Sequence, residues 1–89
     1  MNNTLPGAPA LSATDKAVLR VLLDNCGKVV GRDTILRVAD LDHLGDRRVD
    51  ASIVVLRRAL GADAIATVRR RGWMLGTEFA QPARDILNR

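Results

Sequence analysis

The fold of this chain is limited most by a basic amphipathic stretch at residues 46–60, which is followed by an arginine-rich segment at residues 65–75. Apolar side chains recur at spacings of four, three and four from Val49 to Leu60, so they share one helical face that must be buried. A turn of about 100° per residue places a second set on the opposite face. That set consists of Arg47, Ala51, Val54, Val55 and Arg58. The pattern predicts a helix with one core face and one face presented to a partner.

The segment at residues 65–75 is typical of a β-hairpin, with two short strands around Arg69, Arg70 and Arg71. Gly61 precedes it and can end the helix, because glycine accepts the positive φ that follows many helix ends. A helix of this kind fits the major groove of DNA, and a cationic turn fits the backbone or the minor groove. The two elements together predict a nucleic-acid interface.

Positive charge is concentrated in these two elements. Residues 47–73 hold seven arginines and two acids, whereas residues 1–46 hold five basic and six acidic residues. The net charge of +4 therefore comes from the helix and the hairpin, and there from arginine alone, which suits bidentate contacts with phosphate and guanine. A solvated basic face is the alternative, but the clustering in two adjacent elements favours a polyanionic partner.

Length and composition exclude several other classes of protein. A chain of 89 residues forms one domain and buries roughly 60 to 65% of its unfolded surface. Phe79 and Trp73 are its only aromatic residues, which argues against stacking platforms for single-stranded nucleic acid. Cys26 is the single cysteine, so an internal disulfide is excluded and a reducing cytoplasm is favoured. No apolar run approaches the roughly 20 residues of a membrane helix, so we expect no membrane partner.

The sequence lacks the patterns of an enzyme. It has no nucleophile beside a general base, no glycine-rich phosphate cradle and no cluster of metal ligands. His43 stands alone in a loop and is expected to be solvated, and Cys26 is expected to be a small core residue. We therefore expect no catalytic residue, no cofactor and no metal.

The remaining residues predict two further helices before the basic one. Residues 1–10 are expected to be a flexible leader, and Ser12 with Asp15 forms a capping-box pattern at the start of a helix that ends near Asn25. Residues 28–30 can form one strand segment, and a second helix is expected over residues 32–39. The expected inward-facing residues are Val18, Leu19, Leu22 and Leu23 in the first helix, and Ile35, Leu36 and Ala39 in the second.

The two ends of the predicted domain are less regular. Residues 40–46 form a loop with Asp40, Asp42 and Asp46, for which a solvated linker and a protein-binding loop are both open. For the tail at residues 77–89 two alternatives stay open. Pro82 suits the first turn of a short terminal helix with Ile86 and Leu87 docked on the domain, and a frayed tail is equally compatible.

The order of these elements resembles the winged helix-turn-helix DNA-binding domain of OmpR/PhoB-type response regulators. The resemblance covers residues 11–75. Two of its three segments are residues 11–15 with Val18 and Leu19, and residues 27–33 with Ile35 and Leu36. The third segment is the most specific and consists of Arg47-x-Val49-Asp50, Ile53, Leu56-Arg57-Arg58-x-Leu60 and Thr67-Val68-Arg69-x-x-Gly72-Trp73. It implies a mainly α fold with a small β-sheet (α+β), in which three helices and a C-terminal hairpin wing fill residues 11–76.

The resemblance also implies roles for individual residues. Residues 47–60 would be the recognition helix, with Arg47 and Arg48 at phosphates, and Thr67 and Arg69 would serve the wing. Trp73 stands where the family has a wing tyrosine, and we expect it to be a buried anchor of the hairpin.

This sequence departs from the family pattern at four points. Arg70 replaces a usual wing glycine, and Val54 and Val55 stand where the family commonly has polar side chains that contact bases. We also expect neither the family's N-terminal four-stranded sheet nor its receiver domain in this chain. The two valines leave three interpretations open, namely contact with thymine methyl groups, a protein-binding patch, or tolerated apolar surface.

Two functional hypotheses follow. The first is a small transcriptional regulator that binds double-stranded DNA through Arg47, Arg48, Ala51, Val54, Val55, Arg58, Thr67, Arg69, Arg70 and Arg71. The second is a winged-helix module or accessory partner that binds protein through Val54, Val55 and the loop at residues 40–46. In either case that loop is the candidate contact for RNA polymerase or another regulator.

Overall fold

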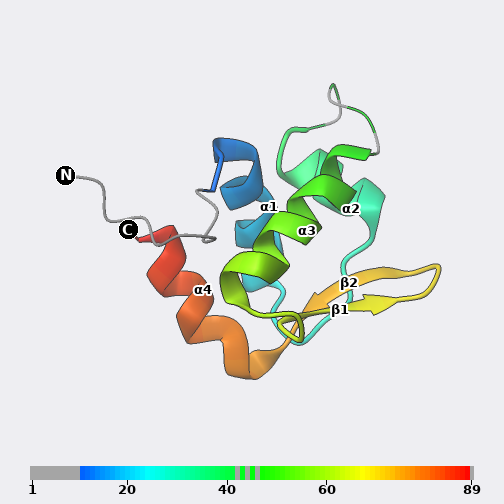
Figure 1. Cartoon of the computed structure of the whole chain (residues 1–89). Helices are drawn as coiled ribbons and strands as arrows, with labels where there is room; N and C mark the ends of the chain where they lie inside the picture. Colours follow the sequence, from blue (N-terminus) through cyan, green and yellow to red (C-terminus); the bar gives the residue numbers. More distant parts are fainter. Residues whose placement is uncertain (1–10, 42, 44, 46, 89) are drawn as a thin grey trace.

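The computed structural model describes residues 11–41, 43, 45 and 47–88, and all structural statements below concern these residues. Its main elements are the helices α1 (Ala13–Asp24), α2 (Arg32–Val38) and α3 (Arg47–Leu60), the strands β1 (Ile65–Val68) and β2 (Gly72–Leu75), and a C-terminal helix α4 (Ala80–Leu87). This is a mainly helical fold with a small antiparallel sheet, as the sequence predicts (Figure 1). None of the described helices is long and apolar enough to cross a membrane.

Helix α1 begins at the predicted capping box. The Ser12 hydroxyl accepts the backbone N–H of Asp15 at 3.1 Å, and the Asp15 carboxylate accepts the N–H of Ser12 at 3.0 Å. Two N–H groups that the helix leaves unpaired are thereby satisfied. The same carboxylate also accepts the Ser52 hydroxyl from α3 at 2.8 Å, so the cap of α1 is tied to α3 inside the protein.

The inner face of α1 forms one wall of the core. Val18, Leu19 and Leu22 are fully buried, as predicted, and Leu23 packs at the edge of the core. Val21, which the predicted inner stripe does not include, is buried as well, because α1 is covered on more than one side. The helix stops just before Gly27, which has a φ of 82° and donates its N–H to the Leu75 carbonyl at 2.9 Å.

Helix α2 is short because a tight C-terminal motif closes it. Asp40 follows its end with a φ of 59°, and the N–H of Leu41 bonds back to the Leu36 carbonyl at 2.7 Å. This 6→1 bond with a left-handed residue before it is the Schellman arrangement, here formed by aspartate in place of the commoner glycine. Leu41 is buried, so part of the acidic loop is structural. Asp42 and Asp46 lie outside the described residues.

The hairpin is a regular antiparallel pair with Ile65 opposite Leu75 and Val68 opposite Gly72. The expected strand at residues 28–30 is reduced to a single bridge between Val30 and Trp73. These two residues exchange both backbone hydrogen bonds, at 2.8 and 3.0 Å. The bridge holds the part of β2 next to the hairpin turn against the connection between α1 and α2.

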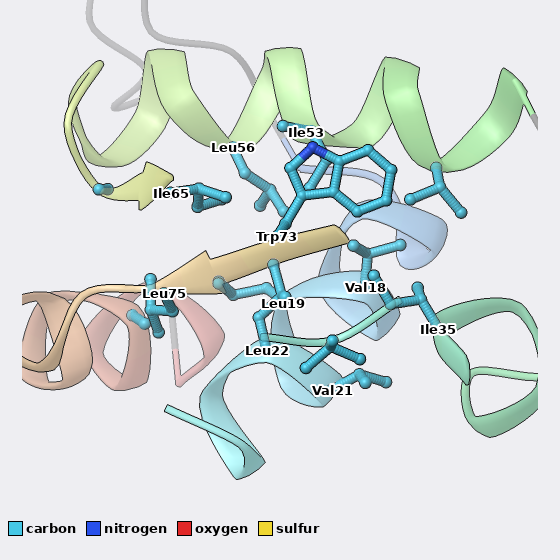
Figure 2. Packing of buried hydrophobic residues seen from close by; sticks show 14 of the residues in the cluster. Val18, Leu19, Val21, Leu22, Ile35, Ile53, Leu56, Ile65, Trp73 and Leu75 are labelled. Carbon is cyan, nitrogen blue, oxygen red and sulfur yellow. The ribbon is translucent and has the colours of Figure 1, made fainter. Parts of the chain in front are cut away.

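The hydrophobic core lies where α1, α2, α3 and the hairpin meet. Figure 2 shows Ile53 and Leu56 of α3 beside the Trp73 ring, with α1 side chains below and Ile35 of α2 at one side. Trp73 is only 8% exposed, which confirms its predicted role as a buried anchor of the hairpin. A large aromatic side chain contributes much of the buried apolar area in a domain this small.

Helix α4 packs on α1 at the end of the molecule opposite the hairpin turn (Figure 1). Ala83 is fully buried, and Phe79, Ile86 and Leu87 pack partly buried against the core. A short 3₁₀ helix, Thr77–Phe79, leads into it. Of the two alternatives for the tail, the structure shows the docked helix.

Candidate nucleic-acid interface

Helix α3 divides its side chains between the core and the surface. Val49, Ile53 and Leu56 are buried, with exposed fractions of 0, 2 and 0%. Of the presented face that the helical periodicity predicts, Arg47, Ala51, Val54 and Arg58 are exposed, whereas Val55 is half-buried. Arg48 is exposed as well, although that periodicity does not place it on this face. No described part of the chain covers these exposed residues.

The three arginines of the wing are all exposed at the turn of the hairpin. The turn spans residues 68–71 and is closed by the Arg71 N–H, which donates to the Val68 carbonyl at 2.9 Å. Arg70 has a φ of 66°, so it adopts the left-handed conformation that glycine usually supplies at the third position of a type II turn. The turn therefore forms without the family's glycine and carries an additional positive charge.

The start of β2, directly after the turn, requires glycine at position 72. Gly72 has a φ of 138°, and a Cβ atom at this position would lie 2.0 Å from the Val30 carbonyl oxygen. Because no side chain can occupy that space, the backbones of β2 and the α1–α2 connection can approach closely enough to form their bridge. The arginine-bearing turn is thus followed directly by the residue at which the hairpin packs most tightly.

An open cleft of about 540 Å³ lies between the start of α2 and the wing. Three predicted interface residues, Thr67, Arg70 and Arg71, line it together with Thr34 of α2. The remaining predicted residues of α3, and Arg69 at the turn, do not line this cleft. The predicted site residues thus occupy two adjacent surfaces, the exposed face of α3 and the wing with its cleft.

Thr67 has a protein partner that the sequence analysis missed. Its Oγ1 accepts a hydrogen bond from Nη2 of Arg57 at 2.7 Å, and Arg57 also donates Nε and Nη2 to the Ile65 carbonyl at 3.0 and 2.8 Å. Arg57 follows Ile53 by one helical turn, so it lies beside the buried stripe and not on the presented face. That spacing is the signal that could have separated Arg57 from the exposed arginines.

Arg32 is a second arginine that connects elements across the site. Its Nη2 lies 2.7 Å from Oδ1 of Asp50 on α3, and its guanidinium lies 5.1 Å from the centre of the Trp73 ring. Arg32 and Asp50 are 18 residues apart in sequence, so no local spacing predicts the pair. Arg32 therefore joins α2, α3 and β2 at the side of the site.

The described residues contain no group of three or more histidine, cysteine or acidic side chains placed to hold a metal ion. Cys26 is half-buried, and its Sγ contacts the Leu75 and Gly76 carbonyl oxygens at 3.6 and 3.5 Å. Asp40 and His43 are exposed, and neither lines the cleft between α2 and the wing.

Three helices followed by a two-stranded hairpin, with an exposed basic face on the third helix, define a winged helix-turn-helix domain. The chain belongs to the family described as "Transcriptional regulatory protein, C terminal", whose model matches residues 7–75. This family comprises the OmpR/PhoB-type DNA-binding domains of transcriptional regulators and is not a class of enzymes.

The chain is also similar to Protein PetR of Rhodobacter capsulatus. The two are 32% identical over 80 residues, which cover 76% of this chain. The matched region spans only 34% of PetR, so the chain corresponds to about a third of that protein. No solved structure matches the chain.

Proposed function

We propose that this domain binds double-stranded DNA as part of a small transcriptional regulator, with α3 in the major groove and the wing at the backbone or minor groove. The observation that carries the proposal is the exposure of Arg47, Arg48, Arg58 and Arg69–Arg71 on two adjacent elements whose apolar sides are buried. Arginine at the start of a groove-binding helix and on a flanking turn positions a protein on phosphates. In this arrangement Arg47, Arg48 and Thr67 position the backbone, Arg58 reaches a phosphate or a base edge, and the turn arginines straddle the minor groove.

The first test measures the affinity for random-sequence duplex DNA by mobility shift over a series of salt concentrations. Each phosphate that a side chain neutralises contributes a slope of about 0.9 in the logarithm of affinity against the logarithm of salt. We expect Arg69→Ala/Arg71→Ala to weaken binding to all sequences and to lower this slope by roughly one to two. The matched control is Arg20→Ala/Arg84→Ala, which removes two exposed charges from α1 and α4.

The outcome of this titration separates the wing from the rest of the surface. Equal effects of the two double variants would mean that the wing acts only through the net charge of the domain. A folded wild-type protein that does not bind duplex DNA at low salt would contradict the proposed function. Arg70 is left unchanged in this experiment, because its backbone conformation makes any substitution there a change in turn stability as well.

We further propose that Ala51, Val54 and Val55 contact thymine methyl groups. Val54 is 49% exposed on the presented face, between arginines of the same face, and apolar side chains recognise the C5-methyl group in the major groove. A selection of bound duplexes from a random pool would give the preferred site. Replacing thymine by deoxyuridine in that site removes only the methyl groups, and we expect it to weaken wild-type binding several-fold.

The corresponding protein variant is Val54→Ala. It should bind the thymine and deoxyuridine duplexes almost equally, because the shorter alanine side chain no longer reaches the thymine methyl group. Val38→Ala is the control, since Val38 is 60% exposed on α2 and outside the presented face. A wild-type protein that does not distinguish the two duplexes would exclude the thymine contact. That outcome would leave the two other interpretations of Val54 and Val55, namely tolerated apolar surface and a protein-binding patch, which is the second candidate function.

A further inference from the structure

The position of the wing relative to α3 is set by a polar contact as well as by the core. Arg57 lies near the C-terminal end of α3, and it is half-buried beside β1. Its guanidinium donates hydrogen bonds to two groups of that strand, the Ile65 carbonyl and the exposed Thr67 hydroxyl. Hydrogen bonds from a charged, planar guanidinium are short and directional, so they fix an orientation that apolar packing alone leaves adjustable.

The geometry also distinguishes Arg57 from its neighbour Arg58. Both follow Leu56, but Arg58 is exposed and its guanidinium donates no hydrogen bond to a described residue, whereas Nε and Nη2 of Arg57 bind within the protein. Nε and Nη2 of Arg57 are thus committed to β1, and only its Nη1 is left to contact another group. The two adjacent arginines of α3 are therefore suited to different tasks.

We propose that Arg57 is a positioning residue, which holds β1 and the wing at a fixed place relative to the recognition helix and does not itself neutralise a phosphate. Two surfaces that must contact one duplex together bind it more tightly when their separation is already set in the free protein. This inference rests on the proposed DNA binding. It assigns a role to an arginine that the charge pattern alone would count among the DNA contacts.

The hairpin has a second attachment, which keeps a change at Arg57 local. Trp73 of β2 is buried in the core and bridged to Val30, and the Arg32 guanidinium lies over its ring. Loss of the Arg57 bonds is therefore expected to loosen β1 and the turn while β2 stays docked. Circular dichroism and a thermal melt establish that each variant is folded before binding is measured.

The test compares Arg57→Ala and Arg57→Lys with Arg58→Ala in duplex binding over a series of salt concentrations. We expect Arg57→Ala to weaken binding roughly three- to tenfold with an unchanged salt slope, since no phosphate contact is lost. Arg57→Lys should not restore affinity, because one ammonium cannot reproduce the paired bonds to Ile65 and Thr67. Arg58→Ala should weaken binding and lower the slope by about 0.9.

Two binding results would overturn the proposal. One is a fall in slope for Arg57→Ala equal to that of Arg58→Ala, together with recovery by lysine, because Arg57 would then be a phosphate contact. The other is wild-type affinity for folded Arg57→Ala. Arg57→Gln, which keeps a donor on a shorter side chain, replaces alanine in the comparison if the alanine variant does not fold.

Amide hydrogen exchange of the free protein keeps this inference separate from the proposed function. Arg57→Ala should speed exchange in the hairpin several-fold and leave the amides of α1 unchanged, whether or not DNA binds. Unchanged exchange in the hairpin would contradict the positioning role. A wild-type domain that does not bind duplex DNA, but shows this exchange pattern, would contradict the proposed function while leaving the role of Arg57 in the fold intact.

Discussion

Arg70 combines a surface charge with a strained backbone. Its φ of 66° lies in the left-handed region, where a side chain with a Cβ is disfavoured by about 1 to 2 kcal/mol relative to glycine. Its guanidinium is exposed and lines the cleft between α2 and the wing. The residue therefore opposes the stability of the turn while adding charge where we propose that DNA binds.

Arg70→Gly should separate these two effects. We expect the free energy of unfolding to rise by about 0.5 to 1 kcal/mol, because relief of the strain exceeds the entropy that glycine adds to the unfolded chain. DNA affinity should fall and its salt dependence should weaken, because one charge is lost. Urea denaturation and duplex titration measure the two quantities.

Arg69→Gly is the control for Arg70→Gly. It removes the same charge from a neighbouring position whose φ is not positive, so it should lower stability instead of raising it. Equal stability changes in the two variants would show that the backbone conformation of Arg70 carries no strain.

Individual residues were predictable from the sequence to the extent that helical geometry decides their environment. The buried face of α3, its presented face and the buried Trp73 follow from spacing and residue type. The partners of Arg57 and Arg32 do not, because they lie on other elements and depend on how these elements pack. An excess of arginine in a segment indicates a charged surface without showing which guanidinium groups bind within the protein.

At the scale of elements, α1 and α3 are joined by a polar contact within an apolar interface. Asp15 and Ser52 are 6 and 1% exposed, and they form the buried hydrogen bond between the two helices. Removing a partner from a buried charged group leaves that group without a hydrogen bond it needs, which is more destabilising than the loss of an exposed bond.

We expect Ser52→Ala to lower the free energy of unfolding by about 1.5 to 3 kcal/mol, since the carboxylate of Asp15 loses a buried donor. Ser12→Ala removes the hydroxyl that accepts the Asp15 backbone N–H without touching α3, and a typical N-cap substitution costs about 1 kcal/mol. Chemical denaturation of both variants compares the two bonds. A smaller effect of Ser52→Ala than of Ser12→Ala would show that the link between the helices contributes little.

The elements themselves were largely predictable, with two informative exceptions. The helix starts and the hairpin carry strong local signals, namely the capping box, the change from helical to alternating spacing, and glycine at the ends. The strand expected at residues 28–30 is one bridge, since pairing depends on a partner strand distant in sequence. The docked α4 could not be chosen over a frayed tail, because its stability comes from α1.

At the scale of the whole molecule, α4 and the turn of the wing lie at opposite ends (Figure 1). The contacts by which α4 stabilises the fold are therefore distant from the proposed DNA contacts of the wing. Deletion of residues 77–89 removes the buried Ala83 and the partly buried Phe79, Ile86 and Leu87 from the core. We expect a loss of about 3 kcal/mol in the free energy of unfolding, from the apolar area that is exposed. DNA affinity measured well below the melting temperature should stay within about twofold of the wild type.

Asp85→Ala is the matched control for the deletion, because Asp85 is exposed on α4 and should change stability little. A deletion variant that is as stable as the wild type would show that the tail is not part of the folded unit. A folded deletion variant with strongly reduced affinity would instead show that α4 takes part in binding, against the separation that the fold suggests.

The close approach at Gly72 has a practical consequence for retargeting this domain. Any of the nineteen other amino acids there would collide with the Val30 carbonyl, while the arginine positions immediately before it face solvent. A combinatorial library that randomises residues 69 and 71 and leaves positions 70 and 72 fixed should consequently yield mostly folded clones. Such a library would sample new contacts with DNA on an unchanged scaffold, whereas one that also varies position 72 would be filled with misfolded chains.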